Sequence, residues 1–358
     1  MAQSKSVLIC VMDWGLGHAT RSLLLIRELI RLGARVHIAS SGNALQLLKE
    51  SFPGLPVLEL PGYRPVYSKS PVAFPWVMLA QAGKWLRVIR RERKFVSRYI
   101  DDHGIDLIIS DNRYGCRNKK VYSVFIGHHL QLQDWWARPV SGWLQMMVRQ
   151  FNECWIPDEA DNRWTGALSK VGWPHQFVGM MSVLSPAPSS VAKEYDVLVI
   201  LSGPEPQRTI FQQLVQQQSS QLRWRVLIVG GRPDLNRNTQ NAGSCEYRPF
   251  VHPEELAVLV RKSNWVICRS GYSTIMDMAC LGAACLMVPT PGQSEQLVLA
   301  RRLTSMNVAP YILQKDLRME ELPLLLEPFT GFGGLYGANR TMFSSHLHSW
   351  WNRYQTEH

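Results

Sequence analysis

A repeated alternation of short apolar runs with longer amphipathic segments is the feature that most constrains the fold of this chain. In the first half, five runs have the length and composition of buried strands: residues 7–12, 34–39, 57–60, 106–109 and 121–126. A glycine-rich turn follows the first run, and a helix is expected from about Arg21 to Leu32. This order predicts βαβ units, in which a parallel sheet carries helices on both faces.

The same pattern starts again after a stretch rich in Pro and Ser, Leu184–Ser190, which makes the best domain boundary. Strand-like runs follow at residues 196–201, 226–229, 265–268 and 284–288. A length of 358 residues also suits two domains better than one core. We therefore predict an α/β chain of two Rossmann-like doubly wound domains, residues 1–184 and 185–334, with ligands in a cleft at the carboxyl ends of the strands.

The seven cysteines argue against two kinds of site. Their number is odd, no CxxC pair occurs, and several lie inside apolar strand-like runs. We therefore expect neither a disulfide framework nor a zinc site, and we expect a reducing cytoplasm. No apolar run approaches the ~20 residues that span a bilayer, and the first run ends at Asp13, so neither a transmembrane helix nor a signal peptide is expected.

A strongly basic stretch lies between Lys84 and Arg98, where seven Lys and Arg residues stand against one acid, Glu92. Apolar residues recur through it at helical spacing, so it predicts a basic amphipathic helix. Two interpretations stay open: a core-facing helix with a solvated basic face, or a surface that holds an acidic ligand or rests on an anionic membrane. No nucleic-acid-binding motif accompanies it. The candidate residues on the acceptor or membrane side are Trp85, Arg87, Arg90, Arg91, His128 and His129.

The first turn with chemical potential is DWGLGHATR, residues 13–21, directly after the first strand-like run. Gly15 and Gly17 allow a tight turn and a close approach to a ligand. His18 is expected at the mouth of the following helix, where a neutral imidazole can take a proton from a hydroxyl near pH 7. The alternative is a structural histidine that caps the helix. Arg21 stands where the dinucleotide-binding fingerprint has its third glycine, so that fingerprint does not fit.

The second turn is IISDNRYG, residues 108–115. Asp111 directly follows a strand-like run, so its carboxylate is expected at the same edge of the sheet as His18. An acid there can orient the imidazole and stabilise its protonated form. The alternative is an Asx turn with Asn112.

The third and most specific stretch runs from Cys268 to Gln296 and contains RSGYSTIMD followed by a second strand and PTPGQSEQ. A helix that begins near Ser273 presents free backbone N–H groups, hydroxyls and a positive dipole end, which suit a diphosphate. Asp277 lies one turn into this helix, where it can accept hydrogen bonds from a ribose diol. The turn SGPEPQR, residues 202–208, is expected beside the same phosphate position.

These motifs, in this order and over nearly the whole chain, resemble GT-B glycosyltransferases of the family 28 type, which are MurG-like UDP-N-acetylglucosamine transferases. The resemblance implies that backbone around Phe250–Val251 reads uracil, that Glu295–Gln296 contact the donor sugar, and that residues 335–358 form a helix that crosses back to the N-terminal domain. The residues that motifs and resemblance together assign to the nucleotide-sugar are Gly15, Gly17, Ser202, Gly203, Arg208, Phe250, Val251, Arg269, Ser270, Gly271, Tyr272, Ser273, Thr274, Asp277, Gln293, Glu295 and Gln296.

The chain also departs from that family. The phosphate-binding turn GGSQGA is here LSGPEPQ, TGGH is GLGH, and Asp277 stands where the family has Glu. These differences indicate a divergent relative with another acceptor. Two alternatives remain: a UDP-sugar hydrolase similar to that of pseudaminic acid biosynthesis, which has a comparable GLGHxxR turn, and a non-catalytic protein that binds nucleotide-sugars.

The expected activity is transfer of a sugar, N-acetylglucosamine or a related hexose, from a UDP-sugar to a hydroxyl of a lipid-linked or cell-envelope acceptor, with inversion. His18 is the expected base and Asp111 its partner, and Arg269, residues 270–274 and the Ser202 turn are expected to stabilise the leaving diphosphate. No DxD-type pair lies at a strand-end turn, so no metal and no cofactor beyond the UDP-sugar are expected. The expected location is the cytoplasm, with the inner face of the membrane as a peripheral contact.

Overall fold

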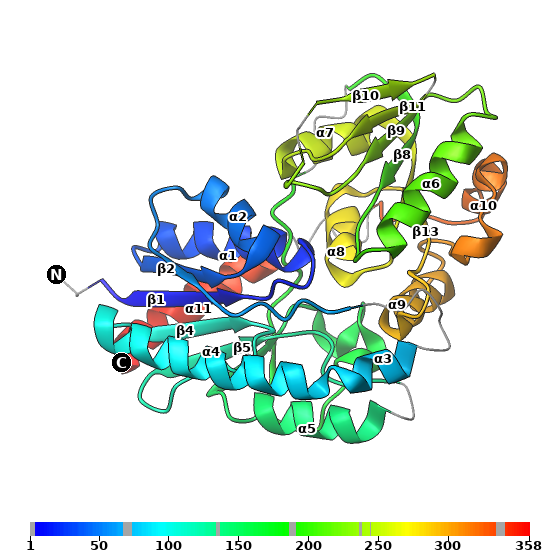
Figure 1. The fold of residues 1–358 in the computed structure, drawn as a ribbon. Helices are drawn as coiled ribbons and strands as arrows, with labels where there is room; N and C mark the ends of the chain where they lie inside the picture. The colour runs from blue at the N-terminus through cyan, green and yellow to red at the C-terminus, as the bar shows by residue number, and fades with distance from the viewer. Residues whose placement is uncertain are drawn as a thin grey trace. The chain divides into compact units, whose positions relative to one another are not determined.

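The computed structural model describes residues 4–66, 74–133, 137–185, 191–235, 238–243, 245–333 and 341–358, which divide into two compact units. Of the described residues, the first unit contains those within 4–66, 76–181 and 341–358, and the second contains 74–75 and those within 182–333 (Figure 1). The chain passes from one unit to the other between Met181 and Ser182. Most of the Pro- and Ser-rich stretch, residues 186–190, and the start of the expected crossover helix, residues 335–340, lie outside the described residues.

The first unit is built on a sheet of seven parallel strands in the order β3-β2-β1-β4-β5-β6-β7. This is the doubly wound strand order that the alternating pattern predicts, and it confirms the expected fold class. The strands are β1 (Ser6–Val11), β2 (Arg35–Ser40), β3 (Val57–Glu59), β4 (Leu107–Asp111), β5 (Tyr122–Ile126), β6 (Glu153–Ile156) and β7 (Gln176–Phe177).

The pairing of β1 with β4 determines where the first two turns meet. Val11 lies opposite Asp111, the last residue of β4, and the Met12 amide donates to the Asp111 carbonyl at 3.1 Å. Both strands are buried along their whole length because helices cover both faces of a parallel sheet. The glycine-rich turn and Asp111 therefore leave the sheet side by side at its carboxyl edge.

Six helices described in the first unit accompany this sheet: α1 (Gly17–Arg31), α2 (Gly42–Ser51), α3 (Phe74–Ala80), α4 (Ala82–His103), α5 (Arg138–Val148) and α11 (Met342–Glu357). Helix α1 begins at Gly17, so the expected start near Arg21 was wrong. The Thr20 amide already donates to the Leu16 carbonyl at 2.9 Å, and the Thr20 hydroxyl donates to the Gly17 carbonyl at 3.0 Å. These bonds make His18 part of the first helical turn.

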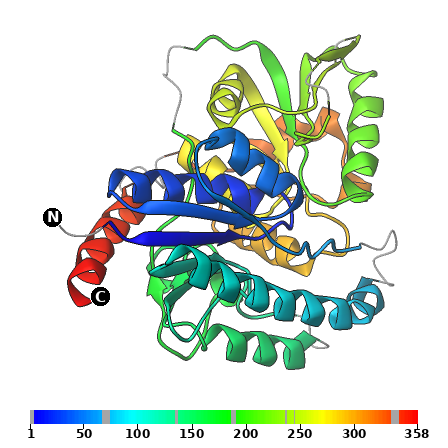
Figure 2. The same ribbon diagram turned by 60° about the vertical axis from the view of Figure 1, so that its left-hand side comes forward.

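The C-terminal helix α11 belongs to the first unit, as both ribbon views show (Figures 1 and 2). The Trp350 indole donates to the Glu153 carboxylate at 2.8 Å, and the Tyr354 hydroxyl donates to the Asp106 carbonyl at 2.9 Å. Trp351 is buried. The helix therefore covers the sheet of the first unit through its aromatic face.

The second unit repeats the architecture with six strands in the order β10-β11-β9-β8-β12-β13, all parallel except β10. They are β8 (Tyr195–Ile200), β9 (Val226–Val229), β10 (Gln240–Ala242), β11 (Cys245–Arg248), β12 (Ser263–Cys268) and β13 (Cys285–Met287). Helices α6 (Gln207–Ser219), α7 (Pro253–Lys262), α8 (Tyr272–Leu281), α9 (Ser294–Ser305) and α10 (Leu322–Leu326) accompany them. Across the ranges described above, no helix combines the length and apolarity needed to cross a bilayer.

Candidate functional site

The glycine-rich turn places His18 at the carboxyl edge of the first sheet. Gly15 has a φ of +87°, a conformation that side chains other than glycine rarely adopt, and it lets the chain reverse between β1 and α1. Gly17 opens the helix, and His18 follows in its first turn. The imidazole is 14% exposed, so it is held by the protein yet open to a ligand on one side.

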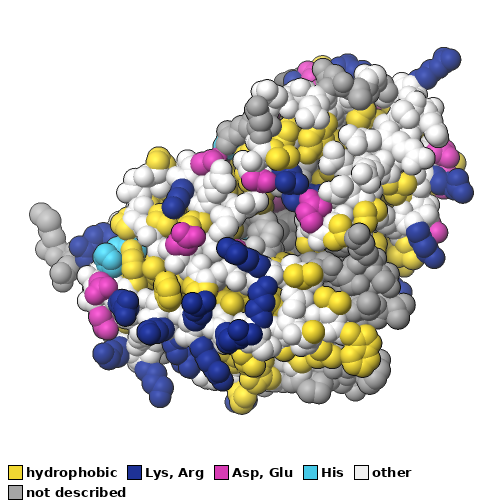
Figure 3. Space-filling view, in the orientation of Figure 1, with side chains coloured by type: hydrophobic (Ala, Val, Ile, Leu, Met, Phe, Trp, Pro, Cys, Tyr) yellow, Lys and Arg dark blue, Asp and Glu magenta, His cyan; other side chains and the backbone are white. Residues whose placement is uncertain are grey.

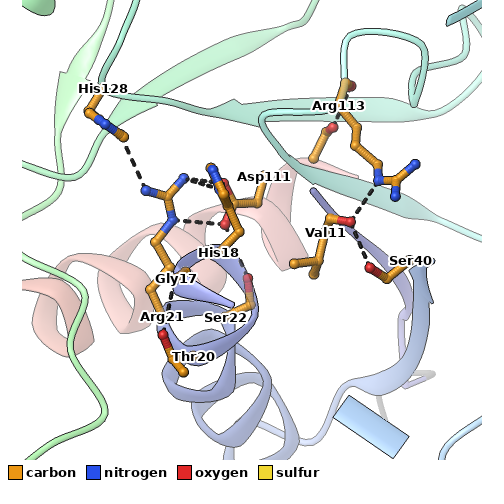
Figure 4. Close-up of polar contacts among 11 residues, drawn as sticks. Val11, Gly17, His18, Thr20, Arg21, Ser22, Ser40, Asp111, Arg113 and His128 are labelled. Carbon is orange, nitrogen blue, oxygen red and sulfur yellow. Dashed lines mark hydrogen bonds and ion pairs between the residues drawn. The ribbon is translucent and has the colours of Figure 1, made fainter. Parts of the chain in front are cut away.

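Asp111 binds this histidine (Figure 4). His18 Nδ1 lies 3.0 Å from Asp111 Oδ1, and Arg21 holds both carboxylate oxygens, with Nε donating to Oδ2 at 2.8 Å and Nη2 to Oδ1. The Ser22 hydroxyl also donates to Oδ2 at 3.2 Å. Since the carboxylate is directed at α1, the Asx turn with Asn112 is not what orients it.

The electrostatics of this cluster keep Asp111 ionised. Burial by itself would raise the pKa of its carboxyl, but the Arg21 guanidinium and His18 outweigh burial and hold that pKa well below its usual range. A carboxylate that accepts the proton on Nδ1 leaves the Nε2 lone pair of His18 free to accept a proton from a substrate. The arrangement therefore suits general-base catalysis.

The two candidate histidines after β5 have different surroundings. His128 is buried, and its Nδ1 lies 3.3 Å from Arg21 Nη1 (Figure 4). His129 is half-buried. His128 thus contacts the cluster around Asp111 through Arg21, and the structure does not expose it on an acceptor surface.

A second buried cluster, centred on Arg113, was not anticipated from the sequence. Its Nε donates to the Val11 carbonyl at 2.6 Å, its Nη1 to Glu92 Oε1 at 2.8 Å, and its Nη2 lies 3.4 Å from Asp13 Oδ1. The Tyr63 amide also donates to the Asp13 carboxylate, at 3.2 Å. Because Asp13 begins the glycine-rich turn, this cluster fixes the start of the turn that presents His18. The sequence signal that could have indicated this cluster is Glu92, the lone acid in a basic stretch. The structure buries Glu92 fully.

Helix α4 carries the other acceptor-side candidates. Trp85 is half-buried, its ring centroid lies 5.6 Å from that of Trp14 in the glycine-rich turn, and its indole N–H is buried without a partner. Arg87, Arg90 and Arg91 are exposed. Trp85 therefore lies beside the turn that presents His18, whereas the arginines face solvent.

In the second unit, three strand-end turns meet around α8. Gly271 is the N-cap of α8, the Ser270 hydroxyl donates to the Gln296 carbonyl at 2.8 Å, and Ser273 and Thr274 are half-buried in the first turn. The backbone N–H groups of that turn have no helical acceptor, which is the property that suits an anion. Tyr272 is buried and packs inward.

The turn after β8 and the loop after β13 approach each other. Gly203 has a φ of +90°, and a Cβ built on it would lie 3.6 Å from the Thr290 hydroxyl. Thr290 is only 2% exposed, and its hydroxyl is buried without a hydrogen-bond partner. Sequence reasoning missed Thr290, whose signal is its place after β13, the neighbour of β12. Ser202 is half-buried in the same turn.

The structure corrects the expected role of Arg269. Its side chain is wholly buried, with Nη1 donating to the Val288 carbonyl at 3.1 Å and Nη2 to Gln314 Oε1 at 2.7 Å. Its guanidinium also lies 4.0 Å from the centroid of the Phe211 ring. It therefore joins core elements and is not presented to a diphosphate, because its only charged group is turned into the domain.

Two further assigned side chains are also engaged by the protein. Gln296 is buried, and its amide oxygen accepts from the Thr290 amide at 2.8 Å while its nitrogen donates to Gln293. Arg208 donates to the Glu205 carboxylate at 3.0 Å and to the Gly231 carbonyl at 3.2 Å. Gln296 therefore joins the loop after β13 to the start of α9 (Ser294–Ser305), and its contact with the donor sugar stays a prediction. Glu295 is half-buried.

Asp277, in α8, has an unusual environment. The Ser182 hydroxyl donates to its Oδ1 at 2.6 Å, and burial raises the pKa of this carboxyl to about 7 despite that bond. Phe250 and Val251 lie just before α7, where the Phe250 ring packs edge-on against His252, with 5.4 Å between centroids.

Solved structures share this fold over nearly the whole chain. The glycotransferase of kitacinnamycin superposes with a TM-score of 0.66 at 16% identity, over 99% of both chains. MurG of Acinetobacter baumannii superposes with a TM-score of 0.55 at 14% identity, over 97% of this chain and 95% of that one. At such identities the likeness shows the fold, which is GT-B.

Family models give the function class. The glycosyltransferase family 28 C-terminal domain matches residues 197–329, which include the α8 turn and Thr290, and glycosyl transferase family 1 matches residues 5–123, which include His18 and Asp111. The chain is a glycosyltransferase with the GT-B fold, and its second unit matches family 28.

A relative of known name is similar to this glycosyltransferase over most of the chain. The UDP-N-acetylglucosamine--N-acetylmuramyl-(pentapeptide) pyrophosphoryl-undecaprenol N-acetylglucosamine transferase of Polaromonas naphthalenivorans is 24% identical over 346 residues, which cover 91% of this chain and 90% of the relative. The similarity therefore spans both units of the glycosyltransferase.

Proposed function

We propose that this glycosyltransferase moves a sugar, N-acetylglucosamine or a related hexose, from a UDP-sugar to a hydroxyl acceptor with inversion at the anomeric carbon. The observation that carries the proposal is the pairing of His18 Nδ1 with the buried, ionised Asp111 at 3.0 Å. An inverting displacement needs one base for the acceptor hydroxyl and one site for the leaving diphosphate. The first unit supplies the base, and the second supplies the diphosphate site.

The acceptor step follows from the state of His18. Its Nε2 takes the proton as the acceptor oxygen bonds to the anomeric carbon, and the bond from that carbon to the diphosphate oxygen breaks. Asp111 stabilises the imidazolium that forms, because it stays ionised in the buried cluster. Each transfer therefore releases UDP and leaves one proton on His18 to be returned to water.

The donor step relies on fixed dipoles in the second unit. The proposed diphosphate contacts are the backbone N–H groups at the start of α8, the turn at Ser202–Gly203 and the Thr290 hydroxyl, which is buried without a partner and lies 3.6 Å from a Cβ built on Gly203. Asp277 and the backbone at Phe250–Val251 are the proposed contacts of ribose and uracil. We propose that these groups act without a metal, and that the UDP-sugar is the one co-substrate.

The acceptor is proposed to be lipid-linked, as the name of the Polaromonas relative specifies for that enzyme. Helix α4 supports a contact with an anionic membrane surface. Its exposed face carries Arg87, Arg90 and Lys94 with exposed Leu86 and Phe95, and basic side chains gather over α4 in Figure 3. Such a face suits peripheral binding to the inner leaflet, which is acidic.

This contact is tested by sedimentation with vesicles that contain or lack anionic lipid. Removing three charges from α4 (R90Q/R91Q/K94Q) is expected to weaken binding to anionic vesicles about a hundredfold, at about 1 kcal/mol per charge near the surface. The matched control R301Q/K315Q/R318Q removes three exposed charges from the second unit and is expected to bind like the wild type. Equal binding by both variants would show that α4 is a solvated face.

The transfer itself is tested by UDP release from a panel of UDP-sugars, with and without a detergent extract of candidate lipid and glycan acceptors. We expect release only when the extract is present. Rapid release that ignores the extract would make the protein a hydrolase, with water in place of the acceptor. Failure to release UDP or to bind any UDP-sugar would overturn the proposal.

A further inference from the structure

Arg21 makes contacts that the proposed mechanism does not use. Its side chain is 1% exposed, and its guanidinium binds both oxygens of Asp111 while lying 2.9 Å from His18 Nδ1 and 3.3 Å from His128 Nδ1. It is therefore the one group in this described cluster that contacts the base, the acid and the second histidine (Figure 4).

The contacts of Arg21 with Asp111 are hydrogen bonds, whereas its contact with His18 is only a short distance. A guanidinium can only donate, and its fork matches a carboxylate in a bidentate way. Arg21 Nη2 and His18 Nδ1 both donate to Oδ1 of Asp111. The two nitrogens therefore lie close together because they share that oxygen. The proton on Nδ1 then belongs to the His18–Asp111 bond, and Nε2 carries the lone pair.

The charges point the same way. Asp111 alone would favour the protonated form of His18, since an opposite charge within 4–6 Å stabilises it. Arg21 places a compensating positive charge against the same carboxylate and against His18. Three titratable or charged groups face His18 in the described first unit: Asp111 on β4, Arg21 one helical turn along α1, and His128, which reaches it through Arg21.

We propose that Arg21 is a positioning residue that fixes Asp111 and, by balancing its charge, keeps the imidazole of His18 neutral and ready to act as a base. This inference rests on the proposed function, in which His18 takes a proton. Without Arg21, the carboxylate would favour the imidazolium, and the base would be lost at neutral pH although His18 and Asp111 were both present.

The test is an NMR titration of histidine labelled with ¹⁵N and ¹³C, which needs no substrate. Arg21→Gln is expected to raise the pKa of His18 by about 1–3 units, Asp111→Asn to lower it, and the double variant to return it near the wild-type value. Arg21→Lys, which keeps the charge without the fork, is expected to shift it less than Arg21→Gln. The acid limb of the pH profile of kcat/KM should move with the titration.

A matched control separates charge balance from loss of packing. Arg117→Gln removes another buried guanidinium of the first unit, which donates to Gln150, so it is expected to lower stability without moving the His18 titration. If Arg21→Gln does not fold, the difference between Asp111→Asn and the double variant isolates Arg21. An unchanged or lowered pKa of His18 on removal of Arg21 would overturn the inference.

The same spectra keep this inference separate from the proposed function. The ¹⁵N shifts report which nitrogen of His18 carries the proton. A proton on Nε2 in the wild type would contradict the role of His18 as a base. A proton on Nδ1 together with an insensitive pKa would contradict the role of Arg21 alone.

Discussion

His18 Nδ1 lies 3.0 Å from Asp111 Oδ1, although 93 residues separate them in the chain. The contact follows from topology, because β1 and β4 are neighbours. Asp111 is the last residue of β4, and the turn that carries His18 follows β1 at the same edge of the sheet. Arg21 and Ser22 hold the other side of the carboxylate. The pair is therefore fixed before any substrate binds, which reduces the reorganisation that catalysis requires.

Thr290→Val tests whether the buried hydroxyl serves the donor. Removing an unpartnered buried hydroxyl without changing shape should raise the free energy of unfolding by about 1–2 kcal/mol. If the hydroxyl binds the diphosphate, affinity for UDP should fall about 5–10-fold, the cost of about one hydrogen bond. Calorimetric titration with UDP and urea unfolding measure the two effects.

Thr304→Val is the matched control for that variant, because the Thr304 hydroxyl donates to the Ala309 carbonyl at 2.8 Å. It should lower stability and leave the affinity for UDP unchanged. A Thr290→Val protein that gains stability and binds UDP like the wild type would remove Thr290 from the donor site.

Gly203→Ala tests the turn after β8. A residue with a side chain at a φ of +90° costs about 1–2 kcal/mol, so the turn should relax away from its present form. We expect the affinity for UDP to fall about tenfold. Gly243→Ala, at a φ of +62° in the turn between β10 and β11, introduces comparable strain elsewhere and should bind UDP normally. Equal affinities in the two variants would show that the turn after β8 does not contact the donor.

Arg269→Met tests the reassignment of Arg269 to the core. The variant leaves the Val288 carbonyl and the Gln314 side chain without their donor, so we expect a loss of about 2–4 kcal/mol in the free energy of unfolding. The folded variant should bind UDP within twofold of the wild type. A normal unfolding curve with a large loss of UDP affinity would return Arg269 to the phosphate site.

The raised pKa of Asp277 predicts that the free energy of unfolding depends on pH. Its carboxyl has a pKa raised from 3.8 to about 7 in the folded chain, so between these values the unfolded chain releases a proton that the folded chain retains. Stabilisation is therefore fully present below about pH 4 and is lost as the pH rises to about 7. Asp277→Asn should remove this dependence and make the protein about 1–3 kcal/mol more stable than the wild type at pH 8. Parallel pH profiles for the two proteins would contradict the raised pKa.

Much of the fold could be predicted because buried parallel strands are continuous apolar runs. Val226–Val229 is a strand with the predicted bounds, and β1 and β4 differ from prediction by one or two residues at their ends. The strands β6, β7, β10 and β11 were not predicted, since each has only two to four residues and includes polar ones. Their pairing with neighbours decides their structure, and pairing is not a local property.

Site residues could be predicted where their place after a strand determines their position. They could not be predicted where a charged side chain is buried. His18 and Asp111 follow neighbouring strands, so their proximity could be inferred. Arg113 and Glu92 were missed, and Arg269 was misplaced, because charged side chains are usually exposed and only tertiary partners make their burial tolerable. A single sequence does not encode those partners at recognisable spacing.

Whether His18 is the base for transfer from a UDP-sugar is tested by comparing the turnover and UDP affinity of His18→Ala with those of the wild type. With the extract fraction that supports UDP release, the variant should lose about 10²–10⁴-fold in turnover, the usual contribution of a general base. Its affinity for UDP should stay within twofold, because the donor groups lie in the second unit. Turnover close to that of the wild type, with UDP still bound, would show that His18 is not the base.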